Sequence, residues 1–79
     1  FLGLKYAFYA ARIGGSMPTV FNAANERAVS KFLNRKIGFT DIYEIIRQSM
    51  DRHKVIQNPN LDEILVAEDE TYKWIESRW

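Results

Sequence analysis

The opening segment, residues 1–13, is apolar on every side, and this constrains the fold more than any other feature. Its apolar or aromatic residues are Phe1, Leu2, Leu4, Tyr6, Ala7, Phe8, Tyr9, Ala10, Ala11 and Ile13. A helix over 2–13 has one face with Leu2, Tyr6, Tyr9 and Ile13, and a second with Leu4, Phe8 and Ala11. A helix that is apolar all round is buried on more than one side. In a chain this short, we expect one of those sides to pack against protein outside residues 1–79.

Length and composition limit the chain to one small folded domain. Its 79 residues are 47% apolar and 14% aromatic, which is too rich for a disordered segment. A domain of this size buries only about 60% of its unfolded surface, so its core is modest. The first residue is Phe1 rather than Met. We therefore expect either that a segment has been removed or that the chain is part of a longer one.

Several classes of protein are excluded by what the sequence lacks. The chain contains no cysteine, which excludes disulfides and thiolate metal sites and is compatible with a reducing compartment. It has no run of about 18 apolar residues, so we expect no membrane span, and it shows no secretory signal segment. Net charge is +1, but the two halves differ in sign: residues 1–36 are basic and residues 37–79 are acidic. We expect this contrast to attract the halves to each other or to a neighbour.

The remaining pattern predicts three or four further helices. Gly14 and Gly15 end the first helix, Ser16 is a candidate N-cap, and Pro18 suits the first turn of a helix over 18–34. Its expected core stripe is Val20, Ala24, Ala28 and Phe32, widened by Phe21, Val29 and Leu33. The alanines predict a close approach between helices.

Helix three is expected over 41–53, capped by Thr40, with its core face formed by Ile42, Ile45, Ile46, Ser49 and Met50. Asn60 is expected to cap a helical segment over 61–66, and a last helix is expected over 68–78; whether the two are separate depends on a possible break near Ala67–Glu68, so the helices number four, or five if the last one breaks. No strand-like alternation competes with these patterns. The predicted fold class is all-α, a compact bundle of four to five helices with short connections.

One polar cluster on the second helix calls for a reason. Asn22, Asn25 and Glu26 lie at neighbouring helical positions among alanines, although Asn is a mediocre residue for a helix interior. One interpretation is a group that faces a substrate or a metal. The interpretation that we favour is a polar network that fixes how this helix meets the rest of the protein.

Two basic features have simpler explanations than catalysis. Arg27, Lys31 and Arg35 recur every four residues, with Lys36 beside them. They could bind nucleic-acid phosphates, but the solvated face of an amphipathic helix is the favoured interpretation. His53 is the only histidine, and a positive charge near a helix C-terminus explains it better than a ligand role.

The acidic run at residues 68–70 lacks the spacing and the glycine of a calcium loop. We interpret it as a complement to the dipole at the start of the last helix. The sequence contains no glycine-rich phosphate loop, no nucleophile elbow and no zinc-protease motif. The residues by themselves therefore describe a helical module without an active site.

A family resemblance adds to this interpretation. Residues 14–26 read GGSMPTVFNAANE, and residues 37–42 read IGFTDI. Together with Ala28-Val29 and Phe32-Leu33, these runs resemble the C-terminal helical domain of the 1-deoxy-D-xylulose 5-phosphate reductoisomerase family. Residues 61–65, LDEIL, with Ala67 resemble the closing segment of the family more loosely. Arg27 departs from the family's pattern, where an uncharged residue is commoner, and Val66 and Glu68 stand where an acidic residue and an aspartate, respectively, are expected.

The resemblance implies a parent oxidoreductase of the non-mevalonate route to isoprenoids. The family converts 1-deoxy-D-xylulose 5-phosphate to 2-C-methyl-D-erythritol 4-phosphate with NADPH and a divalent metal, magnesium or manganese. It implies that the nucleotide site and the metal and substrate sites lie in domains before Phe1. No catalytic, cofactor-binding or metal-binding residue is therefore assigned within residues 1–79.

By the same resemblance, residues 1–79 form an accessory domain that packs on and braces the catalytic domain. Its partners are the remaining domains of the same polypeptide, the parent is a homodimer, and neither nucleic acid nor membrane is bound. The implied location is the cytoplasm, or a plastid in a photosynthetic eukaryote. The alternative is an independent helical module that binds a partner protein or nucleic acid.

Overall fold

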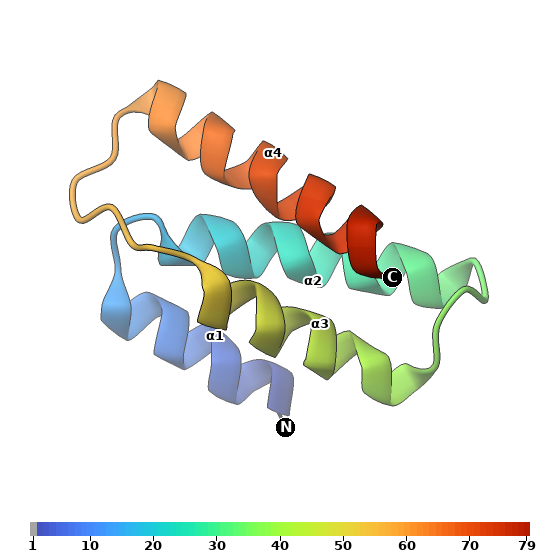
Figure 1. The fold of residues 1–79 in the computed structure, drawn as a ribbon. Helices are drawn as coiled ribbons and strands as arrows, with labels where there is room; N and C mark the ends of the chain where they lie inside the picture. Colours follow the sequence, from blue (N-terminus) through green and yellow to red (C-terminus); the bar gives the residue numbers. More distant parts are fainter. Residues whose placement is uncertain (1) are drawn as a thin grey trace.

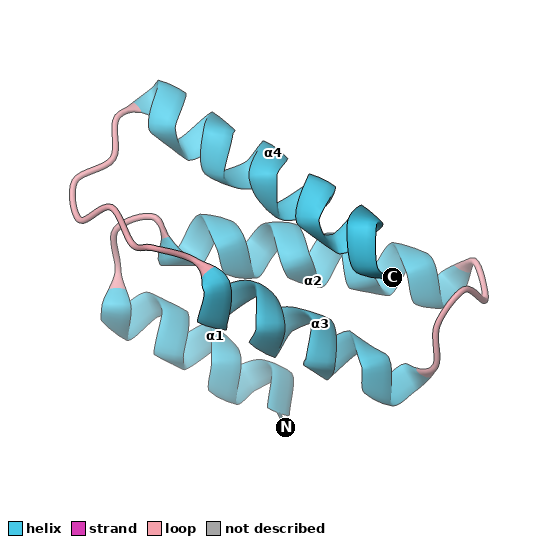
Figure 2. Cartoon of the chain, viewed as in Figure 1, coloured by secondary structure: helices cyan, strands magenta, loops and turns pink. Residues whose placement is uncertain are grey.

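Four helices account for most of the chain, as Figures 1 and 2 show. The computed structural model describes residues 2–79, apart from the side chain of Leu2. Within these residues there is no strand, and the helices are α1 (Leu2–Ile13), α2 (Met17–Leu33), α3 (Phe39–Arg52) and α4 (Leu61–Arg78). The prediction of an all-α bundle is confirmed, with helix boundaries within two residues of those expected for the first three helices. None of the described helices has the length and apolar character needed to cross a membrane.

Helix α2 is the centre of the bundle. It contacts the other three helices, whereas α1 and α4 do not contact each other and lie on opposite sides of the α2–α3 pair (Figure 1). The core lies among the helices and is formed by Ala10, Met17, Val20, Ala24, Ala28, Ile42, Ile45, Ile46, Met50, Ala67 and Ile75. Ala24 and Ala28 have no exposed surface, which confirms the close helix approach that their small size predicts. The predicted core face of α3 is also confirmed.

The helix ends follow local backbone chemistry, with two corrections to the predicted caps. Thr40 is not the N-cap of α3, because that helix begins at Phe39 after Gly38. The Gly38 N–H donates to Asp41 Oδ2 at 2.9 Å, so a carboxylate in the first turn satisfies the free backbone donor. Ser16 precedes α2 but its side chain makes no capping bond, since its hydroxyl is engaged elsewhere.

The predicted cap of the last helix is confirmed, and of the two alternatives for this segment the structure has the unbroken helix. Asn60 Oδ1 accepts from the Glu63 N–H at 2.8 Å, and Glu63 Oε1 accepts from the Asn60 N–H at 3.0 Å. Helix α4 then continues without interruption through Ala67, since residues 61–78 include neither glycine nor proline. Ala67, Thr71 and Ile75, four residues apart, are buried on one side of it. Packing along that continuous stripe favours one helix over two.

Candidate docking interface

The outer side of α1 leaves large apolar side chains exposed. Leu4 is 54% exposed and Phe8 is 61% exposed, while Ala10 on the inner side is 1% exposed. The second apolar face predicted for this helix is therefore uncovered in this chain. The other predicted face is wrong in part, because Tyr9 and Ile13 are also exposed. The side of α1 that is turned toward the bundle carries Ala10, which is buried, and Tyr6, which packs partly buried against the core.

A second exposed stripe runs along α2. Asn22, Asn25 and Glu26 are exposed, and Val29 and Leu33 continue the same line at helical spacings of three and four residues. The expectation that Val29 and Leu33 widen the core stripe is wrong: Leu33 is 72% exposed. The inner side of α2 is filled by Val20, Ala24 and Ala28. Val29 and Leu33 lie away from that side.

The two stripes belong to helices that contact each other. Tyr6 and Tyr9 line a hollow of α1 with Arg47, Met50 and Asp51 of α3, so that flank of α1 faces α3, and Leu4 and Phe8 lie on the exposed remainder. We call the combined surface the open face; its members are Leu4, Phe8, Asn22, Asn25, Val29 and Leu33.

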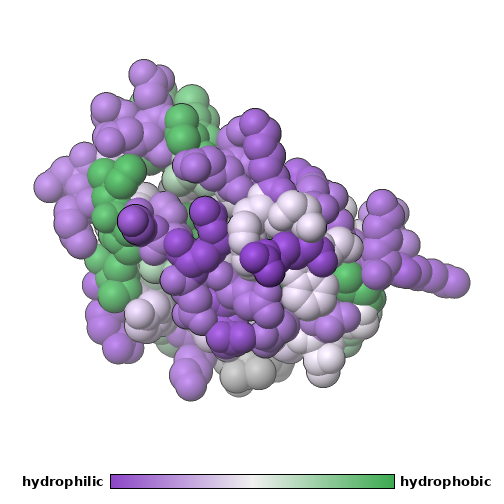
Figure 3. All heavy atoms as spheres, viewed as in Figure 1, coloured by the Kyte–Doolittle hydropathy of each residue, from purple (hydrophilic) through white to green (hydrophobic). Residues whose placement is uncertain are grey.

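The face of the molecule that is turned toward the viewer in Figures 1 and 3 exposes few apolar groups. The side toward the viewer is mostly hydrophilic, and its hydrophobic atoms form a few separate groups near the margins (Figure 3). Large exposed apolar side chains beside a row of amides are typical of a surface that meets another protein surface.

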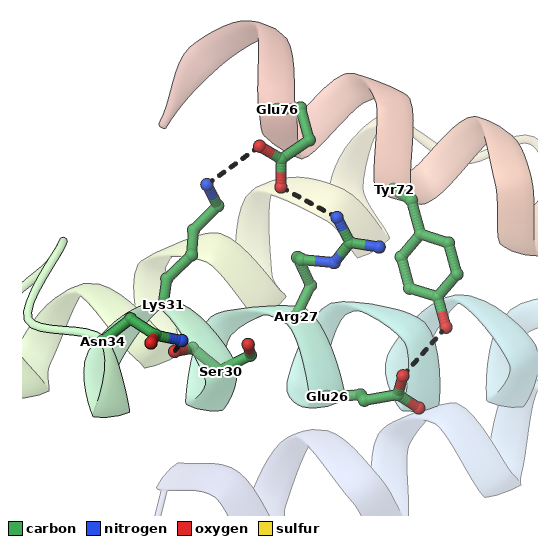
Figure 4. A network of polar contacts seen from close by, with 7 residues as sticks. All are labelled: Glu26, Arg27, Ser30, Lys31, Asn34, Tyr72 and Glu76. Carbon is green, nitrogen blue, oxygen red and sulfur yellow. Dashed lines mark hydrogen bonds and ion pairs between the residues drawn. The ribbon is translucent and has the colours of Figure 1, made fainter.

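A cluster of charged groups joins α2 to α4 at the edge of the open face. Glu76 of α4 accepts from Arg27 Nη1 at 2.9 Å and from Lys31 Nζ at 3.1 Å (Figure 4). Arg27 also lies 4.3 Å from the centre of the Tyr72 ring, and the Tyr72 hydroxyl lies 3.4 Å from Glu26 Oε1. Hydrogen bonds from Arg27 and Lys31 lower the pKa of Glu76. We call Arg27, Lys31 and Glu76 the α2–α4 ion cluster.

The basic stripe is therefore not a solvated face, as the sequence suggested. Lys31 is only 6% exposed because it lies on the same side of α2 as Ala24 and Ala28. Its aliphatic stem packs against the bundle while its ammonium reaches Glu76. Arg35 and Lys36 are exposed, but they lie beyond the end of α2. The four cations do not form one continuous row for nucleic-acid phosphates.

The other candidate residues are dispersed. His53 lies at the end of α3 with Nε2 2.7 Å from Ser16 Oγ, and burial and Arg52 lower its pKa. The interpretation of His53 as a favourable positive charge is therefore wrong. Glu68, Asp69 and Glu70 lie in the middle of α4, not at its start, and Asp69 pairs with Lys73 at 2.8 Å. Across residues 2–79, no three histidine or acidic side chains gather as metal ligands would.

Sequence reasoning missed the roles of Glu76, Tyr72 and Ser16. The opposite charges of the two halves were the available signal for the ion cluster, since Arg27 and Lys31 belong to the basic half and Glu76 to the acidic half. The Ser16–His53 contact had no such signal. Its partners are 37 positions apart and share no charge pattern.

Comparison with known proteins decides the family. Residues 1–74 match the model of the DXP reductoisomerase C-terminal domain. The chain belongs to this family. A 1-deoxy-D-xylulose 5-phosphate reductoisomerase of Agathobacter rectalis is 52% identical over 79 residues, which are 100% of this chain and 21% of that protein. The enzyme of Lachnoclostridium phytofermentans is 54% identical over 74 residues, 94% of this chain and 19% of that protein.

A more distant relative, the reductoisomerase of Listeria innocua, is 48% identical over 77 residues, 98% of this chain and 20% of that protein. The chain thus spans about a fifth of the length of the curated relatives that it matches. In this reductoisomerase C-terminal domain, the run Gly14–Glu26 crosses the α1–α2 turn and continues into α2. That run supplies Asn22 and Asn25 to the open face.

Proposed function

We propose that this chain acts as the C-terminal helical domain of a 1-deoxy-D-xylulose 5-phosphate reductoisomerase. The parent enzyme would convert that substrate to 2-C-methyl-D-erythritol 4-phosphate, an NADPH-dependent step of non-mevalonate isoprenoid synthesis. The name shared by the relatives and their match over nearly the whole chain support this proposal. About four fifths of each relative lies outside the matched region, which is enough sequence for a nucleotide-binding domain and a catalytic domain.

The role proposed for the domain is to brace the catalytic domain through the open face. The observation that carries this role is the exposure of Leu4, Phe8 and Leu33 beside the amides of Asn22 and Asn25. Apolar groups on such a surface favour burial, and the amides fix its register through hydrogen bonds. Misplacing a catalytic group by about 1 Å can lower a rate by about a hundredfold, so a brace influences turnover without touching substrate.

The cofactor and the metal are proposed to bind outside residues 1–79. NADPH and magnesium or manganese would be held by the domains that precede this one, so this domain would contribute no catalytic or ligand residue. Its partners would be those domains, in a homodimeric parent located in the cytoplasm. The exposed positions of Asn22, Asn25 and Glu26 are compatible with contacts between domains.

The test is a pair of substitutions in the full-length parent polypeptide. Phe8→Asp places a charge on the open face, and Val66→Asp places one on α4, where Val66 is 54% exposed. We expect Phe8→Asp to lower kcat and thermal stability together, because it puts an unpaired charge in the interdomain contact. Val66→Asp should leave both near the unmodified values. Equal, small effects of the two variants would contradict the brace and favour an independent binding module.

A further inference from the structure

The hydroxyl of Ser16 lies between two polar partners in the interior. Ser16 has no exposed surface, and its Oγ lies 2.7 Å from His53 Nε2 and 2.8 Å from the Ile56 nitrogen. The Ser16 backbone N–H donates to the Ile56 carbonyl oxygen at 2.9 Å. Three hydrogen bonds therefore tie the α1–α2 turn to the connection between α3 and α4. We call this group the Ser16 junction.

The donors and acceptors of the junction identify the form of the imidazole. The Ile56 N–H can only donate, so Ser16 Oγ accepts there, and its own proton is left for His53. Although Oγ could also accept from a protonated Nε2, the buried hydroxyl proton would then have no acceptor among the contacts of Ser16, which favours a neutral ring with its proton on Nδ1. A protonated ring would also donate to Oγ. The buried Ser16 hydroxyl proton would then lose its acceptor, which is unfavourable in the interior.

The backbone at this place is packed too closely to adapt easily. Gly15 has a φ of +56°, and a Cβ added there would overlap the Ile56 carbonyl oxygen. The turn and the connection also lie side by side at one end of the bundle in Figure 1. A change in the hydrogen bonds of Ser16 is therefore transmitted to residues 53–60, and through them to the start of α4.

From this geometry we propose that the Ser16 junction is a pH-sensitive contact that is weaker in acid. A neutral His53 helps to hold the α3–α4 connection against the α1–α2 turn, and protonation of His53 weakens that contact because the buried Ser16 hydroxyl proton loses its acceptor, while the two hydrogen bonds between Ser16 and Ile56 remain. The inference concerns the fold of this chain and is independent of the function proposed above.

The charged groups around His53 act in both directions. Burial, the larger influence, and Arg52 lower the pKa of His53, while Glu70 of α4 raises it. Lys54, Asp62 and Glu63 line the same hollow of the surface as His53. The α1–α2 turn itself, residues 14–16, contributes no ionisable side chain.

The sign of the pH effect follows from the lowered pKa. The unfolded chain binds a proton near the ordinary histidine value of about 6.5, before the folded chain does. The contribution of the junction to stability is therefore complete above pH 6.5. It falls as the pH drops below that value and through the lower pKa of the folded state.

A direct test uses the unmodified chain, in which His53 is the only histidine. Nitrogen and carbon NMR of the imidazole should show the Nδ1–H form at pH 8 and a titration midpoint below about 6.5. The amide signals of Ser16 and Ile56 should move with the same midpoint. A midpoint at or above 6.5, an Nε2–H ring, or amide signals that ignore the titration would overturn the proposal.

Two variants separate the imidazole from its surroundings. His53→Gln can present an amide oxygen to the Ser16 hydroxyl but cannot titrate. Its urea midpoint should therefore fall less than that of the unmodified chain between pH 8 and pH 5.5. Ser16→Ala keeps the imidazole but removes its buried partner, and should move the NMR midpoint upward toward 6.5. An equal fall in His53→Gln and the unmodified chain, or an unchanged midpoint in Ser16→Ala, would contradict the proposal that acid weakens the Ser16 junction.

Discussion

The open face and the contact between α2 and α4 contain similar residue types, but the first is exposed and the second is buried. Both involve α2, and both combine apolar side chains with polar ones. Toward α4, Ala23 and Ala24 are buried, and the ion cluster closes the edge with Lys31 only 6% exposed. On the open face, Val29 and Leu33 find no covering element within the described residues.

The difference shows that apolar pattern and burial are separate properties. Helical periodicity tells which side chains share a face, but whether the face is covered depends on the elements available to cover it. A four-helix chain of this length supplies three neighbours for α2 and leaves one side open. If burial decides the difference, substitutions near α4 should change the free energy of unfolding much more than substitutions on the open face.

The largest expected effect separates the core near α4 from the open face. Ile75 is fully buried, so Ile75→Ala should lower the free energy of unfolding by roughly 2–5 kcal/mol in the 79-residue chain. Phe8→Ala should change it by less than about 0.5 kcal/mol, because Phe8 is already largely exposed. Urea unfolding measures both. Comparable losses in the two variants would erase the distinction.

A smaller effect is expected from adding volume. Ala28 is fully buried on α2, so Ala28→Leu adds three carbons to a closely packed place. The substitution should destabilise the chain by roughly 1–3 kcal/mol. Ala11→Leu is the control, because Ala11 is exposed on α1. Its unfolding midpoint should stay close to that of the unmodified chain. If Ala28→Leu is tolerated equally well, the helices are not closely packed there.

The smallest of these effects concerns the ion cluster. Glu76→Gln removes the charge that balances Lys31 and should lower the free energy of unfolding by about 1 kcal/mol, a value reduced by the partial exposure of Glu76. Asp69→Asn breaks an exposed pair with Lys73 and should have almost no effect. Equal effects would show that the burial of Lys31 does not depend on its partner.

The same variant gives a pH signature. The pKa of Glu76 is lowered in the folded state, so its contribution is present above the ordinary carboxyl value of about 4.5. The contribution is lost as the pH falls from there through the lowered value. Denaturation curves of Glu76→Gln and the unmodified chain should therefore converge as the solution becomes more acid. A constant gap down to pH 2 would contradict this assignment.

Much of the fold could be predicted from local signals in the sequence. The glycines at 14 and 15, Asn60 with Glu63, and the isoleucines of α3 each act over a few residues, and the structure confirms them. Local signals do not decide whether the helix breaks near Ala67, because the acidic run there is typical of a helix start, whereas the buried stripe of α4 continues through it.

The polar contacts were harder to predict because their partners are distant in sequence. Lys31 and Glu76 are separated by 45 positions, and Ser16 and Ile56 by 40. Nothing in a helical pattern shows which residues of two helices meet, so Lys31 was assigned to solvent and Ser16 to a cap. The exposure of the second apolar face of α1 could be predicted, because a chain this short has too few elements to cover both faces of that helix, and Leu4 and Phe8 are exposed.

The most direct test of the account asks whether the open face is covered in the parent enzyme. The chain has no cysteine, so Phe8→Cys and Val66→Cys each introduce a single thiol into residues 1–79. Labelling rates should be similar at both positions in the 79-residue chain. In the full-length parent, mass spectrometry of labelled peptides should show that the thiol of Phe8→Cys reacts at least about tenfold more slowly than in the 79-residue chain. The labelling rate of Val66→Cys should be nearly unchanged. Equally fast labelling at both positions in the parent would contradict the claim that this face is where the domain docks.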